Sequence, residues 1–258
     1  MGSRAHREPN RGGDPISLAL PICAEVEARL LCRYKRFFAD VETRDGERLT
    51  VHCPNPGSMR GLLVEGAPVR CSTSDNPRRK LRHTLEMIRI GRTWVGLNTS
   101  RANALAEQAL AAGIVPELSG HESVRREVPA PAIPEHPKNS RLDFLLEGHP
   151  ADPRPLYLEV KSVTMAEGRT ARFPDSVTER GRRHAEVLSR LVSGGARAAL
   201  LFVVQRGDCE RVEPADDIDP AYGDALRQAA NAGVMVLATR VKVGPRVLRL
   251  EGPLPVAL

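Results

Sequence analysis

The first third of the chain consists of short segments in which apolar and polar residues alternate. Such a period of two is typical of half-buried strands, and turn residues such as Asp45-Gly46 separate the segments. The segments are residues 29–41, 49–53, 68–73, 83–90 and 93–97. Five short strands within roughly 70 residues predict a small barrel of the oligonucleotide-binding (OB) type. An SH3-like barrel fits the same pattern almost as well.

From residue 98 onwards the spacing changes to helices that alternate with strands. Helical spacing predicts helices over residues 98–112, 175–191 and 221–232. The predicted strands cover residues 124–128, 140–146, 156–162, 198–204, 234–237 and 246–250. The continuous apolar run 198–204 is typical of a central strand that is covered on both faces. The expected fold class is therefore α/β with an all-β N-terminal domain, and Thr178 or Asp175 is the expected cap of the middle helix.

The length of 258 residues is enough for one large domain or two modest ones. The expected organisation is a disordered extension over residues 1–13, the barrel over 14–98 and the α/β domain over 99–258. The net charge of +6 favours an anionic partner. Because the sequence has neither a run of about 18 apolar residues nor an apolar signal core, we expect a cytoplasmic protein without a membrane partner.

Two common kinds of chemistry are not favoured. The five cysteines are odd in number and form no CxxC pair, so inert thiols are expected rather than disulfides or a zinc site. The chain also has neither GxxxxGK[ST] nor GxGxxG, so the sequence does not favour nucleotide hydrolysis by a P-loop.

Three charged residues stand inside apolar strands of the α/β part. Glu159 and Lys161 are two positions apart, so both side chains point to the same face of one strand. Asp143 lies beside them if the preceding strand is a neighbour. Because charges rarely sit in apolar strands without a partner, the set indicates two carboxylates that bind a hard divalent cation and a lysine that steadies a water. The alternative is an ordinary ion pair on a solvated sheet.

Basic residues offer candidate contacts to nucleic acid. Four cations between residues 78 and 82 either follow phosphates or are simply solvated. Arg180, at the start of the middle helix, either reaches a phosphate near Glu159 or is exposed without a role. The full set of candidates is Arg36, Arg60, Arg78, Arg79, Lys80, Arg82 and Arg180.

Aromatic residues make up only 3% of the chain, which does not indicate a broad platform for stacked bases. Tyr34, Phe37 and Phe38 lie together in the first predicted strand. We therefore expect them to belong to the core of the barrel.

Seven ordered motifs together resemble the sugar fermentation stimulation protein A family. They lie between Arg29 and Leu237, and their number and order make the resemblance specific. The motifs are His52-Cys53-Pro54-Asn55, Asn76-Pro77-Arg78-Arg79-Lys80, Trp94-Val95-Gly96-Leu97-Asn98-Thr99, Ser140-Arg141-Leu142-Asp143-Phe144-Leu145, Glu159-Val160-Lys161-Ser162-Val163-Thr164, Phe173-Pro174-Asp175-Ser176-Val177-Thr178-Glu179-Arg180-Gly181 and Leu201-Phe202-Val203-Val204-Gln205-Arg206.

The resemblance implies an OB barrel followed by a domain of restriction-endonuclease type, the PD-(D/E)xK fold. Members of the family are regarded as DNA-binding, and the family name reflects a link to sugar-utilisation genes. The nuclease pattern is an Asp followed by Glu-x-Lys, and Asp143, Glu159 and Lys161 fit its core. By the same resemblance, Glu107 is the helix acid that often joins this pattern, and Gln205 is an orienting residue.

One barrel loop departs from the family that the chain resembles. Where the family has Thr-Gly-Arg-Met after the asparagine, this sequence has Pro56-Gly57-Ser58-Met59. A loop arginine is therefore lost, with Arg60 nearby. The acidic residues and the lysine of the core pattern are intact.

Two hypotheses of function follow. The first is a nuclease that cuts DNA with Mg²⁺ or Mn²⁺, with Asp143, Glu159 and the carbonyl of Val160 as metal ligands and Lys161 beside the attacking water. The second is a sequence-tolerant DNA-binding regulator of sugar-utilisation genes that uses the nuclease fold only for binding. RNA is a less favoured target than DNA. The oligomeric state is open, with a homodimer as one alternative.

Overall fold

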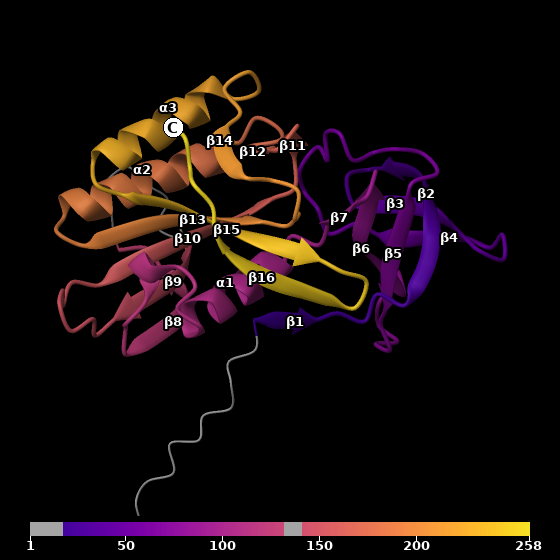
Figure 1. Cartoon of the computed structure of the whole chain (residues 1–258), viewed down its shortest axis with the longest axis horizontal. Coiled ribbons are helices and arrows are strands. Elements are labelled where there is room, and N and C mark those ends of the chain that lie inside the picture. Colours follow the sequence, from indigo (N-terminus) through magenta and orange to yellow (C-terminus); the bar gives the residue numbers. More distant parts are fainter. Residues whose placement is uncertain (1–17, 132–140) are drawn as a thin grey trace, which may run out of the picture.

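The computed structural model describes residues 18–131 and 141–258. A small barrel and a larger mixed sheet with helices lie side by side (Figure 1). The predicted disordered extension over residues 1–13 lies outside the described residues. In the described part, no helix is both long and apolar enough to cross a membrane.

The barrel is built from the strands nearest the N-terminus. Its strands are β2 (Val26–Tyr34), β3 (Phe38–Thr43), β4 (Arg48–His52), β5 (Pro68–Thr73), β6 (His83–Ile90) and β7 (Thr93–Gly96). Their order is β4-β3-β2-β5-β6, and a parallel bridge between His52 and Thr84 joins β4 to β6 and closes the barrel. Strand β7 extends the sheet beyond β6. The predicted five-stranded barrel is confirmed.

The prediction of one long strand over residues 29–41 is wrong, because the chain turns back within it. Lys35 and Arg36 adopt positive φ angles of 46° and 65°, and they connect β2 to β3 as a tight hairpin. Neither residue is the Gly or Asn that usually marks such a turn, so no local signal indicated it.

The larger sheet has the order β1-β16-β15-β13-β10-β9-β8. Strands β10, β13 and β15 run parallel to one another, and the other pairs are antiparallel. The elements of this part are β1 (Ala19–Pro21), α1 (Arg101–Ala111), the 3₁₀ helix Pro116–Leu118, β8 (Ser123–Pro129), β9 (Arg141–Glu147), β10 (Leu156–Val163), α2 (Glu179–Ser193), β13 (Arg197–Val204), α3 (Pro220–Asn231), β15 (Met235–Val243) and β16 (Val247–Pro253).

Two features of this part were not expected from the sequence. Residues 19–21, which lie within the range predicted for the barrel, pair with β16 of the larger sheet. A small sheet also forms beside it, in the order β11-β12-β14. Its strands are β11 (Ala166–Glu167), β12 (Thr170–Phe173) and β14 (Arg211–Pro214).

Helices cover both faces of the larger sheet (Figure 1). Leu105 of α1 packs with Leu158 and Leu201 on one face, whereas Leu188 of α2 packs with Leu200 on the other. All residues of β13 after the first are buried, which confirms the predicted central strand. Since each fully buried leucine side chain contributes roughly 1.5–3 kcal/mol, these two apolar layers stabilise the sheet.

The barrel packs against the C-terminal end of the central strand β13. The N–H of Gly96 in β7 donates to the carbonyl of Gln205 at 2.9 Å, and Val95 forms a bridge with Arg206. A Cβ atom at Gly96 would lie 2.7 Å from Oε1 of Gln205, so any larger residue would displace this buried side chain. The barrel is thereby fixed at the end of the sheet where the charged residues of β10 lie.

A buried carboxylate strengthens the same junction. Glu86 of β6 is only 4% exposed and accepts hydrogen bonds from Ser72 at 2.8 Å, Asn98 at 3.0 Å and Arg101 at 2.9 Å. Since Arg101 begins α1, this ion pair joins the barrel to the first helix of the larger part.

We expect Glu86→Ala to lower the free energy of unfolding by about 2 kcal/mol, because it leaves Asn98 and Arg101 without their acceptor. Urea denaturation would measure the change. The matched control is Glu42→Ala, which removes an exposed pair with Arg48 at 3.7 Å and should change stability by less than about 0.5 kcal/mol. Equal stability of the two variants would contradict the role of Glu86 at the junction.

Candidate functional site

Glu159 and Lys161 form the centre of the candidate site. Both side chains leave β10 on the same face, as the alternation predicts, and Lys161 Nζ lies 2.6 Å from Glu159 Oε1. Both side chains are largely buried, with exposures of 5% for Glu159 and 13% for Lys161. The alternative of an ion pair on a solvated sheet is therefore wrong.

Helix α2 contributes a residue that sequence reasoning missed. The Nδ1 of His184 forms a hydrogen bond with Glu159 Oε1, and Nε2 accepts from Arg180 Nε at 3.4 Å. The tautomer with hydrogen on Nδ1 satisfies both contacts. His184 thus connects the carboxylate of the sheet to an exposed arginine in the first turn of the helix.

Asp143 reaches the site from the neighbouring strand. The pairing of β9 with β10 ends at Phe144 and Leu158, and beyond it the Asp143 carboxylate accepts the backbone N–H of Val160 at 2.7 Å. Asn103 of α1 donates to the other oxygen of Asp143 at 2.8 Å. The carboxylate is therefore held from both the sheet and the helix.

The electrostatics of the two carboxylates differ. Burial, together with the charge of Glu159, raises the pKa of Asp143 above its ordinary value. Burial also opposes ionisation of Glu159, but Lys161 and His184 outweigh it and leave its pKa below the ordinary value. Ionisation is therefore favoured for Glu159, whereas burial and the negative charge of Glu159 disfavour ionisation of Asp143.

One oxygen of this site has no partner. Oε2 of Glu159 is buried without a hydrogen bond, although Oε1 has two. An unpaired carboxylate oxygen beside a second carboxylate suits a hard cation, which prefers oxygen ligands. Residues 18–131 and 141–258 contain no cluster of three or more His, Cys, Asp or Glu side chains arranged for a metal, so further ligands would be main-chain oxygens, substrate or water.

A cleft of about 570 Å³ opens beside these residues. Three of its lining residues, Asn103, Val160 and Lys161, are direct contacts of the two carboxylates. Arg36 from the barrel hairpin and Arg180 from α2 line the same cleft. The cleft therefore places cations from both parts of the chain next to residues that contact Asp143 and Glu159, although the two carboxylates are not among its lining residues.

The barrel loop with the altered family motif forms one wall of this cleft. Asp175 accepts the backbone N–H of Met59 at 2.9 Å, and the hydroxyl of Ser58 donates to the carbonyl of Asp175 at 2.5 Å. A Cβ atom at Gly57 would lie 2.4 Å from the Asp175 carboxylate. Of the two predicted caps of α2, Thr178 is the one found, because its hydroxyl accepts the N–H of Gly181 at 3.1 Å.

The structure does not bring Glu107 into the site. Its side chain pairs with Arg126 at 3.2 Å, and both side chains are about half exposed. Asn103, one helical turn earlier, is the residue of α1 that contacts Asp143.

Gln205 lies beside the site rather than in the cleft lining. Its side chain is fully buried and donates to Ser162 of β10 at 2.7 Å, while its main chain binds Gly96 of the barrel. Because this contact is with the residue after Lys161, an orienting role for Gln205 stays a prediction.

The other predicted arginines and lysines lie outside the cleft lining. Arg79 donates to Thr84 at 2.9 Å within the barrel. Arg60 is exposed and lies near Asp217, whose pKa it helps to lower after the stronger effect of Arg172. The remaining exposed candidates are Arg78, Lys80 and Arg82.

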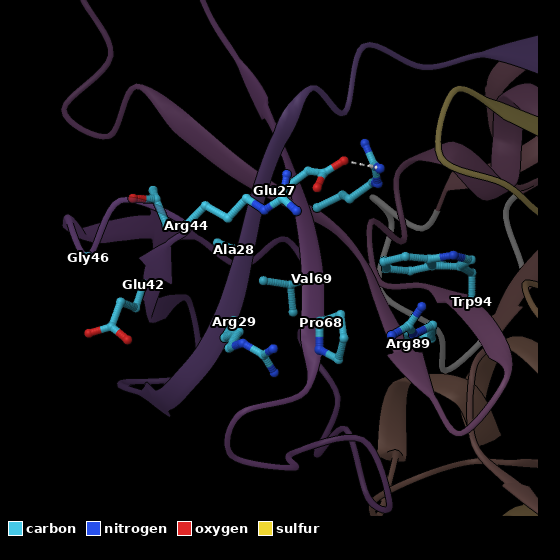
Figure 2. A pocket seen from close by; sticks show the side chains of 12 residues that line it. Glu27, Ala28, Arg29, Glu42, Arg44, Gly46, Pro68, Val69, Arg89 and Trp94 are labelled. Carbon is cyan, nitrogen blue, oxygen red and sulfur yellow. Dashed lines mark hydrogen bonds and ion pairs between the residues drawn. The ribbon is translucent and has the colours of Figure 1, made fainter.

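A second hollow, of about 580 Å³, lies on another flank of the barrel. Figure 2 shows Arg29, Arg44, Arg89 and Trp94 around it. The guanidinium of Arg89 lies 5.7 Å from the centroid of the Trp94 ring, and that of Arg70 lies 6.0 Å from it. This hollow shares no lining residue with the cleft, and it contains none of the acidic site residues.

The fold and the site together define a two-part protein, in which an OB barrel docks on an α/β domain that carries Asp143, Glu159 and Lys161. Comparison with family models agrees with both parts. The model described as "SfsA N-terminal OB domain" matches residues 31–97, and "Sugar fermentation stimulation protein RE domain" matches residues 100–247. The chain belongs to the sugar fermentation stimulation protein family.

Individual relatives show the same relationship. A sugar fermentation stimulation protein homolog of Halorhodospira halophila is 53% identical over 90% of this chain and 95% of its own length. The homolog of Pseudomonas paraeruginosa is 52% identical over 90% of this chain and 97% of its own length. The solved structure of Pyrococcus furiosus SfsA in complex with Ca²⁺ matches with a TM-score of 0.79 at 24% identity, covering 93% of this chain and 98% of that chain.

We expect Asp143→Asn to raise the Tm of the metal-free protein, because the change removes a buried charge that lies near Glu159. An amide of the same shape still offers an acceptor to Val160, and the amide of Asn103 can turn to accept from it. Divalent cation at about 100 times its Kd should stabilise the wild type by about 2.7 kcal/mol, and the variant should lose this gain. Thermal unfolding with and without Mg²⁺ would measure both effects, and an unchanged gain in the variant would exclude Asp143 as a ligand.

Proposed function

We propose that this protein is a divalent-metal-dependent nuclease that hydrolyses phosphodiester bonds in DNA. The observation that carries the proposal is the unpaired, buried Oε2 of Glu159 beside Asp143, with Lys161 on the same face. Family membership supports it, because the resemblance implies a nuclease-type domain behind a nucleic-acid-binding barrel.

Asp143 and Glu159 would hold the cation, with the carbonyl of Val160 as a third ligand. Bound Mg²⁺ or Mn²⁺ would polarise the scissile phosphate and lower the pKa of a coordinated water. The Ca²⁺ complex of the Pyrococcus furiosus relative is consistent with oxygen ligands for a hard cation in this fold.

The residues around the carboxylates have separate tasks in this proposal. Lys161 offsets the negative charge that develops on the phosphate or positions the attacking water. His184 holds Glu159 Oε1, so that Oε2 remains directed to the cation. Arg180 and Arg36 bind phosphates that flank the scissile bond, since both line the cleft.

A second candidate is a DNA-binding regulator of sugar-utilisation genes that does not cut. The family name, which refers to the stimulation of sugar fermentation, supports this candidate. Its binding would depend on the arginines and would weaken as salt rises.

We also infer a cytoplasmic location. Size-exclusion chromatography would test the homodimer that we named as an alternative.

We expect end-labelled DNA to be cut by the wild type in Mg²⁺ or Mn²⁺, and Glu159→Gln to slow cleavage by at least about 100-fold, or about 2.7 kcal/mol. The variant loses the charge that holds the cation but keeps a side chain of the same size. Lys161→Met should be slowed similarly while its DNA affinity remains within about threefold, because the lysine acts mainly in the transition state.

The matched control is Glu107→Gln, which removes an exposed acid of α1 away from the cleft and should leave cleavage within about twofold of wild type. If the wild type and Glu159→Gln bind DNA equally and neither cuts it in any divalent metal, the regulator is the correct function. Cleavage that survives in Glu159→Gln would remove this residue from the mechanism.

A further inference from the structure

The tip of the barrel hairpin exposes aromatic rings, contrary to the prediction that they are core residues. Tyr34 is 37% exposed and Phe37 is 41% exposed. The Tyr34 ring stacks on Phe38, with 5.7 Å between centroids and 17° between planes. Exposed rings are costly in water, so a cluster of them at one turn indicates a contact surface.

The backbone of this tip adopts an unfavourable conformation. Lys35 and Arg36 both have positive φ angles, of 46° and 65°, without being glycine or asparagine. Backbone strain of this kind persists where surrounding contacts enforce it, and strained residues are common at binding sites. The conformation places the side chain of Arg36 in the cleft lining and leaves Phe37 exposed next to it.

Arg33 connects the tip to the wall of the cleft. Its Nε donates to the carbonyl of Arg36 at 3.0 Å, and its Nη2 donates to the carbonyls of Asn55 at 2.8 Å and Gly57 at 2.9 Å. Asn55 and Gly57 line the cleft. The carbonyl of Phe37 also accepts the N–H of Cys53 at 2.9 Å. The backbone that carries the exposed rings is therefore held next to the wall of the cleft.

The chemistry of this edge favours one class of ligand. Aromatic rings beside cations that line a groove bind single-stranded nucleic acid, because rings stack on bases while cations hold phosphates. A closed duplex covers the faces of its bases and cannot offer them to Phe37 or Tyr34. An unpaired strand offers both groups at once.

We propose that the hairpin tip Tyr34–Phe37 binds unpaired nucleotides, so that a DNA single strand, or the single-stranded end of a duplex, is the substrate that enters the cleft. Phe37 and Tyr34 stack on bases, and Arg36 holds the phosphate that leads towards Lys161. This inference rests on the proposed function in one respect, since it takes DNA to be the occupant of the cleft.

Binding without divalent metal tests the inference apart from catalysis. The probes are a fluorescently labelled oligodeoxynucleotide and its blunt duplex, measured by anisotropy in EDTA at fixed salt. We expect the wild type to bind the single strand at least about tenfold more tightly. Phe37→Ser should weaken single-strand binding by about fivefold to 100-fold, as expected for one lost stacked base, and should change duplex binding less than about twofold.

Two control variants, Leu63→Ser and Arg44→Ala, separate the effects of base stacking and of local charge from general effects of substitution. Leu63→Ser removes another exposed apolar side chain of the barrel, 47% exposed and outside both hollows, and should leave both affinities unchanged. Arg36→Ala should weaken single-strand binding, whereas Arg44→Ala removes the same charge at the second hollow (Figure 2) and should change it less than about twofold. Thermal unfolding would confirm that each variant is folded.

The outcomes distinguish this inference from the nuclease proposal. Selective binding of the single strand that depends on Phe37, in a protein that cuts nothing, would support the inference and overturn the nuclease. Cleavage of single strand and duplex at equal rates, with Phe37→Ser unaffected, would overturn the inference and leave the nuclease intact. Equal loss of both affinities in Phe37→Ser would also overturn it.

Discussion

The hydrogen bond between Gly96 of β7 and the carbonyl of Gln205 fixes the barrel to the larger sheet. Because Gln205 directly follows the central strand and its side chain binds Ser162 of β10, the junction and the strand that carries Lys161 belong to one network. Together with the Glu86–Arg101 ion pair and the contacts of Ser58 and Met59 with Asp175, this junction brings the barrel hairpin and the start of α2 to the same cleft. A side chain at position 96 would force the Gln205 side chain to move, since its Cβ would lie 2.7 Å from Oε1 of Gln205.

The site shows a second constraint, which is the burial of Glu159. A carboxylate with one unpaired buried oxygen is costly, and Lys161 and His184 offset that cost only on the other oxygen. The apolar layers on both faces of the sheet provide the stability against which such a site is maintained. Buried polar atoms without a hydrogen-bond partner are common in ligand-binding sites. If the protein satisfied all of these atoms itself, none would be available to bind the ligand.

Local patterns in the sequence predicted the parts of the site that depend on one or two strands. The alternation in β10 places Glu159 and Lys161 on one face, and neighbouring strands bring Asp143 beside them. His184 and Asn103 were missed, because their contacts depend on how α2 and α1 pack on opposite sides of the sheet. Glu107 was chosen by resemblance, but its position on α1 directs it to Arg126 instead. A search for polar residues on the buried faces of the predicted helices would have found His184.

The arrangement of the cations divides them into two groups with different physical effects. Arg36 and Arg180 line the cleft, so they contact whatever phosphate lies there, and their effect is limited to short range. The exposed cations between residues 78 and 82 lie outside the lining, where water and salt screen them within about 10 Å at 0.1 M ionic strength. Such charges accelerate encounter with an anionic chain more than they stabilise the bound state. Under the proposed function, the net charge would therefore attract nucleic acid, whereas the selection of a bound strand would depend on the few side chains at the junction of barrel and sheet.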